Sequence, residues 1–259
     1  MKAHTGPDIG VQQPLRGFRL GLLLWFVGMP GVVAVTATLL PVMLAGQPLP
    51  MPLWVLALLS LVQNGVILAL AVWAGVALAP AVGLHAPVLG AAITRSPLGP
   101  VLRPQLLPGL VVGLLGGAFL FGAWRLAPDV LASVQERLSL PLFARVLYGG
   151  ITEELLLRWG LMTVLVWLGW ACLQRRRAAP AAGLIWIAIV MSALVFGAGH
   201  LPAAAVLAGP LDAAAVAWVL GFNTTFGLLF GYLFWRYGLE SAMIAHGLAH
   251  VVHYLAETV

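Results

Sequence analysis

Long apolar stretches cover almost the whole chain, and short segments that hold prolines and most of the charged residues separate them. A helix needs about 20 apolar residues to cross a bilayer, where only helices or closed barrels satisfy the backbone. The pattern predicts helices over residues 18–44, 52–80, 106–126, 141–173, 180–200, a stretch ending near Arg236, and 240–256. We therefore predict an all-α fold, a polytopic transmembrane helical bundle of about seven or eight spans.

Polar and helix-breaking residues predict what lies between these helices. Residues 1–16 are polar and form the predicted N-terminal tail, and residues 81–104 form a predicted surface loop. Residues 128–145 mix charges with leucines, which is typical of an interfacial amphipathic helix or a helix extension into the headgroups. Pro202 is expected to end the fifth helix, because the residue before a proline disfavours the helical conformation. Residues 201–217 then form either a loop with a helix start or a short extra span.

The composition excludes a soluble domain. Of the 259 residues, 62% are hydrophobic and only 8% are charged, whereas a soluble domain has about 25% charged residues. The formal charge of +5 does not indicate nucleic-acid binding, since the basic residues are scattered singly apart from Arg175–Arg177. We interpret that cluster, which follows an apolar run, as a topology signal, so the expected partner is the lipid bilayer with no nucleic acid. The single cysteine, Cys172, excludes an intramolecular disulfide and a CxxC metal site.

The chain is expected to have three parts. These are the tail at 1–16, N-terminal transmembrane helices at 17–127, and a region at 128–259 that holds the candidate chemistry. Positive residues favour the cytoplasmic side of a membrane. This rule places on the inner side Arg16, Arg19, Arg95, Arg103, Arg175–Arg177 and Arg236, and on the outer side Asp129 and Glu136. The expected location is a bacterial-type inner (plasma) membrane.

Two adjacent glutamates, Glu153 and Glu154, and Arg158 lie inside one of the apolar stretches. Ionisable groups are costly in hydrocarbon and are functional by default. Residues four apart share a helix face, so Glu154 and Arg158 are expected to pair as a structural clamp. Glu153, offset by about 100° on an α-helix, is then expected to face a different neighbour as the reactive carboxylate. The alternative is a set of helix-packing ion pairs without a catalytic role.

Four histidines follow in later apolar stretches. His246, His250 and His253 have spacings of four and three, which place three imidazoles on one helix face. An imidazole can donate to a developing oxyanion, hold a water or bind zinc. His200, four residues after Phe196, is weaker alone, and Asn223 is expected to form a hydrogen bond between helices.

In order along the chain, Glu153-Glu154-xxx-Arg158, Phe196-xxx-His200 and His246-xxx-His250 resemble the motifs of the CPBP family. This family comprises CAAX proteases and bacteriocin-processing intramembrane proteases, and its motifs are EExxxR, FxxxH and HxxxN or HxxxD, each on a separate helix. The resemblance covers about residues 141–256. His250 departs from it, because the family usually has asparagine or aspartate at that position.

The resemblance implies an intramembrane endopeptidase that hydrolyses a peptide bond of a membrane-associated protein or peptide. By analogy, Glu153 and His200 activate a water, while His246 and His250 orient the peptide carbonyl or stabilise the oxyanion. Both a metal-dependent mechanism and a glutamate-type mechanism without metal have been proposed for the family.

No cofactor is certain from the sequence. The zinc protease motif HExxH is missing from the sequence. Glu153, His200, His246 and His250 nevertheless form a candidate zinc set, so a divalent metal stays open. Two functions of other classes stay open as well. One is a proton-coupled transporter that uses Glu153 and the histidines as a relay, and the other is a non-catalytic membrane immunity or scaffold protein.

Overall fold

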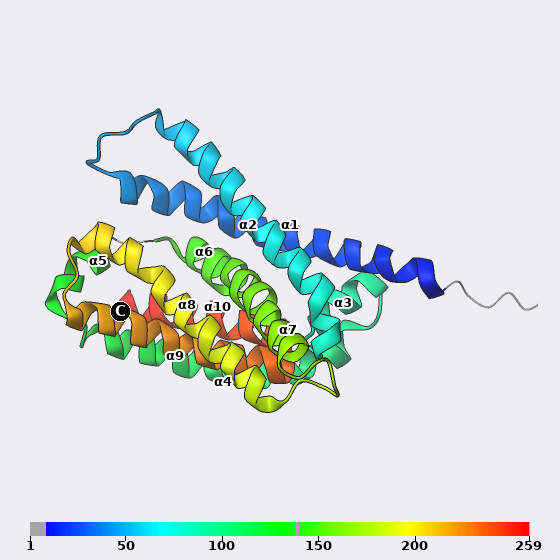
Figure 1. The fold of residues 1–259 in the computed structure, drawn as a ribbon. Coiled ribbons are helices and arrows are strands. Elements are labelled where there is room, and N and C mark those ends of the chain that lie inside the picture. The colour runs from blue at the N-terminus through cyan, green and yellow to red at the C-terminus, as the bar shows by residue number, and fades with distance from the viewer. Residues whose placement is uncertain (1–8, 138–139, 259) are drawn as a thin grey trace, which may run out of the picture.

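The computed structural model of the protein describes residues 9–137 and 140–258, and these residues form helices with no strand among them (Figure 1). Six of the long helices are α1 (Ile9–Leu44), α2 (Leu53–Val82), α4 (Leu98–Trp124), α8 (Ala182–Ala208), α9 (Ala213–Tyr237) and α10 (Leu239–Glu257). A further long helix comprises α6 (Leu142–Ala144), η2 (Arg145–Glu153), η3 (Leu155–Met162) and α7 (Thr163–Cys172). Short connecting elements are α3 (Pro87–Thr94), η1 (Asp129–Leu131) and α5 (Ala132–Arg137).

Six helices among the described residues are long and apolar enough to cross a membrane. They are Arg16–Leu44, Leu53–Val82, Leu98–Trp124, Leu142–Cys172, Ala182–Ala208 and Ala213–Tyr237. Helix α10 is the seventh long helix, and its glutamates and histidines make it less apolar. The predicted all-α polytopic bundle is confirmed, and the number of spans agrees roughly with the expected seven or eight.

Helix α8 continues past Pro202 to Ala208, so the prediction that Pro202 ends the fifth helix is wrong. Membrane helices tolerate an interior proline, because neighbouring groups and small local adjustments satisfy the freed backbone carbonyl. The helix ends instead at Gly209, whose φ of 86° is readily adopted only by glycine. The Asp212 carboxylate then caps α9 by accepting a hydrogen bond from the Ala215 N–H at 2.8 Å. Residues 201–217 therefore add no further crossing.

Two other helices begin earlier than predicted. Helix α1 starts at Ile9, inside the predicted tail, although its candidate span starts at Arg16. Residues 1–8 of the tail lie outside the described residues. The predicted loop at 81–104 contains α3 and the first turns of α4. The apolar pattern measures the hydrocarbon core of about 30 Å, whereas helices also extend through headgroup layers to a total of about 40–45 Å.

The basic loops gather at one end of the bundle. Figure 1 places α3 and the segment between α7 and α8 at one end, and α5, the turn between α8 and α9 and the C-terminus at the other. Arg95 caps α3, and Arg175–Arg177 lie between α7 and α8. Arg137, in the last turn of α5, lies at the opposite end, where Arg145 is paired with Glu257. Which end faces the cytoplasm stays a prediction.

Helix α10 packs closely against α4 through glycines of α4. A Cβ atom at Gly113 would lie 2.7 Å from Leu248 Cβ and 2.9 Å from the Ala245 carbonyl oxygen. Gly109 and Gly117 make similar approaches one turn away on each side. Small residues at four-residue spacing let transmembrane helices approach closely. The glycines of α4 thus provide the flat surface on which the histidine helix lies.

Polar groups anchor the first turn of α10. The buried Gln105 accepts a hydrogen bond from the Ser241 N–H at 3.1 Å, and the Ser241 hydroxyl donates to the Gln105 carbonyl at 3.2 Å. The Glu240 carboxylate accepts a hydrogen bond from the Leu89 N–H at 2.8 Å, near the start of α3. A carboxylate at a helix N-terminus satisfies N–H groups that have no partner in the helix. These bonds tie α10 to both α3 and α4.

The glutamate-bearing helix is fixed against the N-terminal helices. The Thr152 hydroxyl donates to the Gly28 carbonyl at 2.7 Å, and the buried Trp159 indole donates to the Val72 carbonyl at 3.0 Å. The N-terminal helices therefore support the helix that carries the candidate chemistry, although none of the motif residues lies on them.

Candidate active site

The helix that carries Glu153 and Glu154 is wound as a π-helix on both sides of Glu154. Two hydroxyls lie near carbonyls five residues earlier, as this winding requires. Thr163 donates to Arg158 O, and Thr152 lies 3.2 Å from Leu147 O while its one hydrogen is shared with the Gly28 carbonyl. π-helical turns are rare and occur frequently at functional sites. Because a π-turn holds more residues than an α-turn, adjacent residues are separated by less than the usual angle of about 100°.

Glu154 is the centre of a buried ionic cluster. Its side chain is 0% exposed, and Arg158, one turn later, is 1% exposed. Glu154 Oε1 lies 3.1 Å from an Arg158 guanidinium nitrogen and 2.8 Å from His246 Nδ1. Arg158 also donates to the Gly227 carbonyl at 3.3 Å, and its guanidinium lies 4.9 Å from the centre of the Phe196 ring. The expected pairing of Glu154 with Arg158 is thus present, and it includes His246.

Glu153 faces the other ring nitrogen of the same imidazole, His246 Nε2. Glu153 Oε2 lies 3.9 Å from His246 Nε2, and the Glu153 side chain is 16% exposed. The expectation that Glu153 faces a different neighbour from Glu154 is therefore corrected. The π-winding reduces the angle between the two carboxylates, and the two nitrogens of one imidazole ring reach both of them.

The His246 ring is held by flat aromatic contacts. It stacks on the Phe230 ring with a centroid distance of 4.5 Å, and on the His250 ring at 4.9 Å. An ionised Glu154 carboxylate can only accept, so we assign the hydrogen in this contact to His246 Nδ1. The neutral ring then presents Nε2 as an acceptor toward Glu153. The position, orientation and tautomer of His246 are thus all determined by its neighbours.

Gly149 provides the space beside the two stacked imidazoles. A Cβ atom at this position would lie 2.5 Å from His250 Nε2 and 3.2 Å from His246 Nε2. The neighbouring Gly150 lets the two helices touch, since a Cβ there would lie 2.8 Å from Gly247 Cα. The Nε2 atoms of both histidines therefore lie over a position that has no side chain.

His200 approaches this cluster from α8. Its Nδ1 donates to the Phe196 carbonyl at 2.8 Å, which leaves Nε2 of the neutral ring as an acceptor. The Phe196 ring makes edge contacts with both His200, at 4.8 Å, and His246, at 6.0 Å between centroids. The three motifs, expected on separate helices, thus converge within the bundle.

Two further polar residues from the sequence pattern lie elsewhere. His253 is buried next to Arg145 and Glu257, toward the end of α10. Asn223 donates to the Val219 carbonyl of its own helix at 2.8 Å, rather than to another helix as expected. A short side chain near a carbonyl of the preceding turn forms such a local bond readily.

The candidate zinc set does not have the arrangement of a metal site. Among residues 9–137 and 140–258, no three His, Cys, Asp or Glu side chains gather where they could hold a metal ion. The Nδ1 atoms of His200 and His246 are bonded to Phe196 and Glu154, so only their Nε2 atoms could bind a metal, and the His246 ring stacks face to face on the His250 ring. A tetrahedral zinc site needs nitrogen lone pairs directed at one point. The donors as arranged here do not fit zinc.

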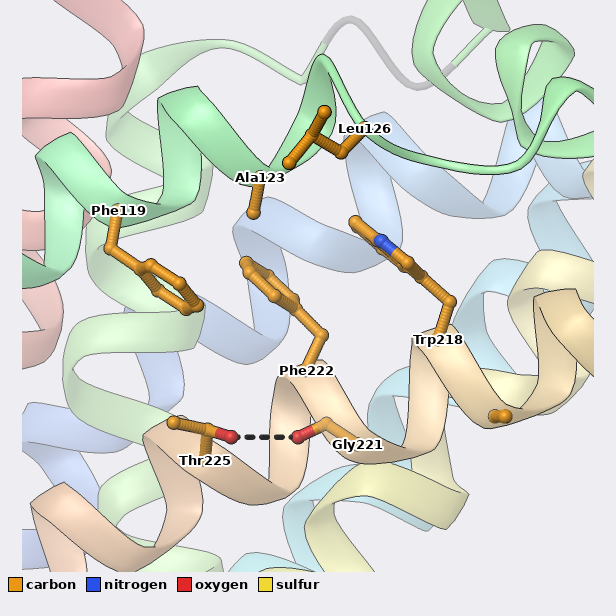
Figure 2. A pocket seen from close by; sticks show the side chains of 8 residues that line it. Phe119, Ala123, Leu126, Trp218, Gly221, Phe222 and Thr225 are labelled. Carbon is orange, nitrogen blue, oxygen red and sulfur yellow. Dashed lines mark hydrogen bonds between the residues drawn. The ribbon is translucent and has the colours of Figure 1, made fainter.

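An apolar groove lies between α4 and α9 (Figure 2). Its walls include Phe119 and Leu126 of the α4 side and Trp218 and Phe222 of α9. From Trp218, contacts between aromatic rings continue through Phe222, Phe226 and Phe230 to His246. This row of rings occupies one face of α9, because its members are four residues apart.

Sequence reasoning missed Gly149, Gly150 and Phe230. The signal for the glycines was their position directly before the glutamates, where small residues allow another helix to approach. The signal for Phe230 was the four-residue spacing of aromatic residues in α9. Neither pattern alone reveals which helix lies opposite.

Residues 135–252 match the family model described as Rce1-like, Type II CAAX prenyl endopeptidase Rce1-like. The match includes all three motifs and confirms the resemblance to the CPBP family. It indicates an intramembrane protease, and together with the six apolar helices it supports an integral membrane protein. No match was found among curated proteins or among solved structures.

Proposed function

We propose that this protein is an intramembrane endopeptidase in which Glu153 is the general base that activates a water. The observation that carries the proposal is the pair of acceptors formed by Glu153 Oε2 and His246 Nε2, 3.9 Å apart beside Gly149. The family match over residues 135–252 supports the reaction class. Its substrate is a membrane-associated protein or peptide.

The spacing of these two acceptors suits one water molecule. A separation of 3.9 Å is too long for a direct hydrogen bond, and two acceptors cannot bond to each other. A water at about 2.8 Å from each atom can donate one hydrogen to each of them. Glu153, the more exposed of the two glutamates, takes a proton as the water oxygen attacks the peptide carbonyl carbon. The protonated Glu153 then gives this proton to the leaving amine as the C–N bond breaks.

The other motif residues have supporting roles in this proposal. His200, with Nε2 as an acceptor, assists water activation as the family resemblance implies. His250 lacks a fixed Nδ1 contact of the kind made by His200 and His246, and it is the imidazole we assign to donate to the oxyanion. Glu154 and Arg158 hold His246 in its orientation. The donor set does not fit zinc, so no step is assigned to a metal.

The site is expected to act in a bacterial-type inner membrane, with the basic end of the bundle in the cytoplasm. The function is tested by incubating purified protein in lipid nanodiscs with membrane-associated peptides and sequencing the products. New termini that appear only with the protein support an endopeptidase. Proton flux into liposomes without any cleavage would favour the transporter instead.

Replacing Gly149 with alanine is expected to reduce cleavage more than it reduces stability. The new methyl group would lie 2.5 Å from His250 Nε2, so both imidazoles must shift. A displacement near 1 Å can lower a rate by about a hundredfold. Gly183→Ala is the matched control, since a Cβ there meets nothing within 4 Å. Equal cleavage rates of the two variants would contradict the assigned position of the imidazoles.

Chelation is expected to leave the cleavage rate unchanged. The reason is that, among the described residues, no three candidate ligands gather where they could hold a metal ion, and the His246 and His250 rings stack instead of directing their lone pairs at one point. The measurement compares initial rates before and after dialysis against a strong chelator, with zinc content determined on the same sample. Activity that is lost on chelation and restored by zinc would show that Glu153 serves a metal-bound water instead.

A further inference from the structure

A second cluster of polar side chains joins the same two helices away from the proposed site. Arg145, the first residue of η2, lies 2.8 Å from Glu257 Oε2 and 3.3 Å from His253 Nδ1. His253 Nδ1 lies 3.5 Å from the same Glu257 oxygen. The Arg145 guanidinium also lies 5.5 Å from the centre of the Tyr254 ring, and its Nε donates to the Leu140 carbonyl at 2.9 Å. Arg145 is therefore held on several sides.

The contacts between η2 and α10 follow an antiparallel order. Arg145 meets His253 and Glu257, Gly150 meets Gly247, and Glu154 meets His246. The close backbone contact at Gly150 and Gly247 thus lies between the Arg145 cluster and the glutamates. Two helices that touch at such a glycine contact can rock about it unless they are held on both sides. The Glu154–His246 bond holds one side, and the Arg145 cluster holds the other.

We propose that Arg145, His253 and Glu257 form a latch that positions the histidines of α10 relative to Glu153. This inference rests on the proposed function, because it assigns the latch to the geometry of that site. The three are positioning residues and do not touch substrate. The latch also gives a role to His253, whose spacing with His246 and His250 placed it on the histidine face of the helix.

The effect should appear in the rate more than in stability. The Arg145 and Glu257 side chains are 15% and 26% exposed, and partly exposed ion pairs add little to stability. A small change in the 3.9 Å spacing between Glu153 and His246, by contrast, acts directly on the proposed reaction. Loss of the latch is therefore expected to lower kcat by about ten- to a hundredfold, with KM and Tm nearly unchanged.

A double-mutant cycle tests the latch through cleavage. Arg145→Ala and Glu257→Ala are each expected to lower kcat, and the double variant should be no slower than the slower single variant. Arg145→Lys, which keeps the charge, should recover most of the rate. Arg137→Ala is the control, as it removes a positive charge in α5. Fully additive losses, unchanged rates in the single variants, or an equal loss in Arg137→Ala would overturn the proposal.

A distance measurement tests the latch without any activity. Phe143 and Leu255 are 55% and 56% exposed, so spin labels can be attached there in a Cys172→Ser background. The distribution of distances between the labels is expected to broaden in Arg145→Ala and to stay narrow in Arg145→Lys. Identical distributions in all variants would overturn the latch. If the parent protein cleaves no peptide, the proposed function fails while this measurement still decides on the latch.

Discussion

Glu153→Gln is expected to abolish peptide cleavage while leaving the protein folded. Glutamine has nearly the same size, but its amide cannot take a proton from water. General base catalysis contributes about 10²–10⁴-fold to a rate, so the cleavage rate of the variant should be lower than that of the parent by at least this factor. The measurement is the initial cleavage rate of purified variants at matched protein concentration.

The control for this substitution is Asp129→Asn, which changes an exposed carboxylate of η1. It removes the same charge at an exposed position outside the three motifs, and its rate should equal that of the parent. Thermal unfolding curves of both variants should overlap with the parent curve. A cleavage rate of Glu153→Gln equal to the parent rate would refute the base assignment.

Arg158→Ala is expected to reduce the yield of folded protein severely. The substitution leaves the buried Glu154 carboxylate without its guanidinium partner and removes the bond to the Gly227 carbonyl. Breaking a buried ion pair by removing one partner costs about 3–5 kcal/mol. The yield of monodisperse protein after size-exclusion chromatography measures the loss. Arg125→Ala, at an exposed arginine, is the control and should keep the parent yield.

Removing both charges separates stability from chemistry. In Glu154→Gln combined with Arg158→Met, no unpaired charge stays buried, so much of the yield should return. Cleavage should stay low, because the neutral amide orients His246 less firmly than the carboxylate does. A well-folded and active Arg158→Ala variant would show that the clamp is not required.

The long helices could be predicted from the sequence because apolar length is a strong signal in a bilayer. The continuation of α8 through Pro202 could not, since it depends on how neighbouring groups satisfy the backbone. The start of α4 at Leu98 was hidden by prolines that a soluble helix would not tolerate. The sequence pattern thus misplaced helix ends where the lipid headgroups or neighbouring helices determine how far a helix extends.

The order of the motifs predicted which helices carry polar groups, and four-residue spacing predicted the pairing of Glu154 with Arg158. The sequence pattern did not predict that both glutamates face His246. This arrangement depends on the π-winding and on the packing at Gly150 and Gly247. Gly149 matters because its lack of a side chain leaves room for the two imidazoles, and a pattern of polar residues in the sequence does not reveal this. The assigned roles stay predictions until cleavage is measured.

The pairing of Glu154 with Arg158 also bears on how this helix enters the membrane. The two charges lie four residues apart on one helix, so the carboxylate carries its own counterion as soon as that helix forms. Insertion then transfers a nearly neutral pair together with the single charge of Glu153, which lowers the desolvation cost. His246 and Gly227 belong to helices that are synthesised later, and they join a pair that is already formed. The bundle can therefore assemble in chain order, and the Glu154 carboxylate is paired before its later partners are synthesised.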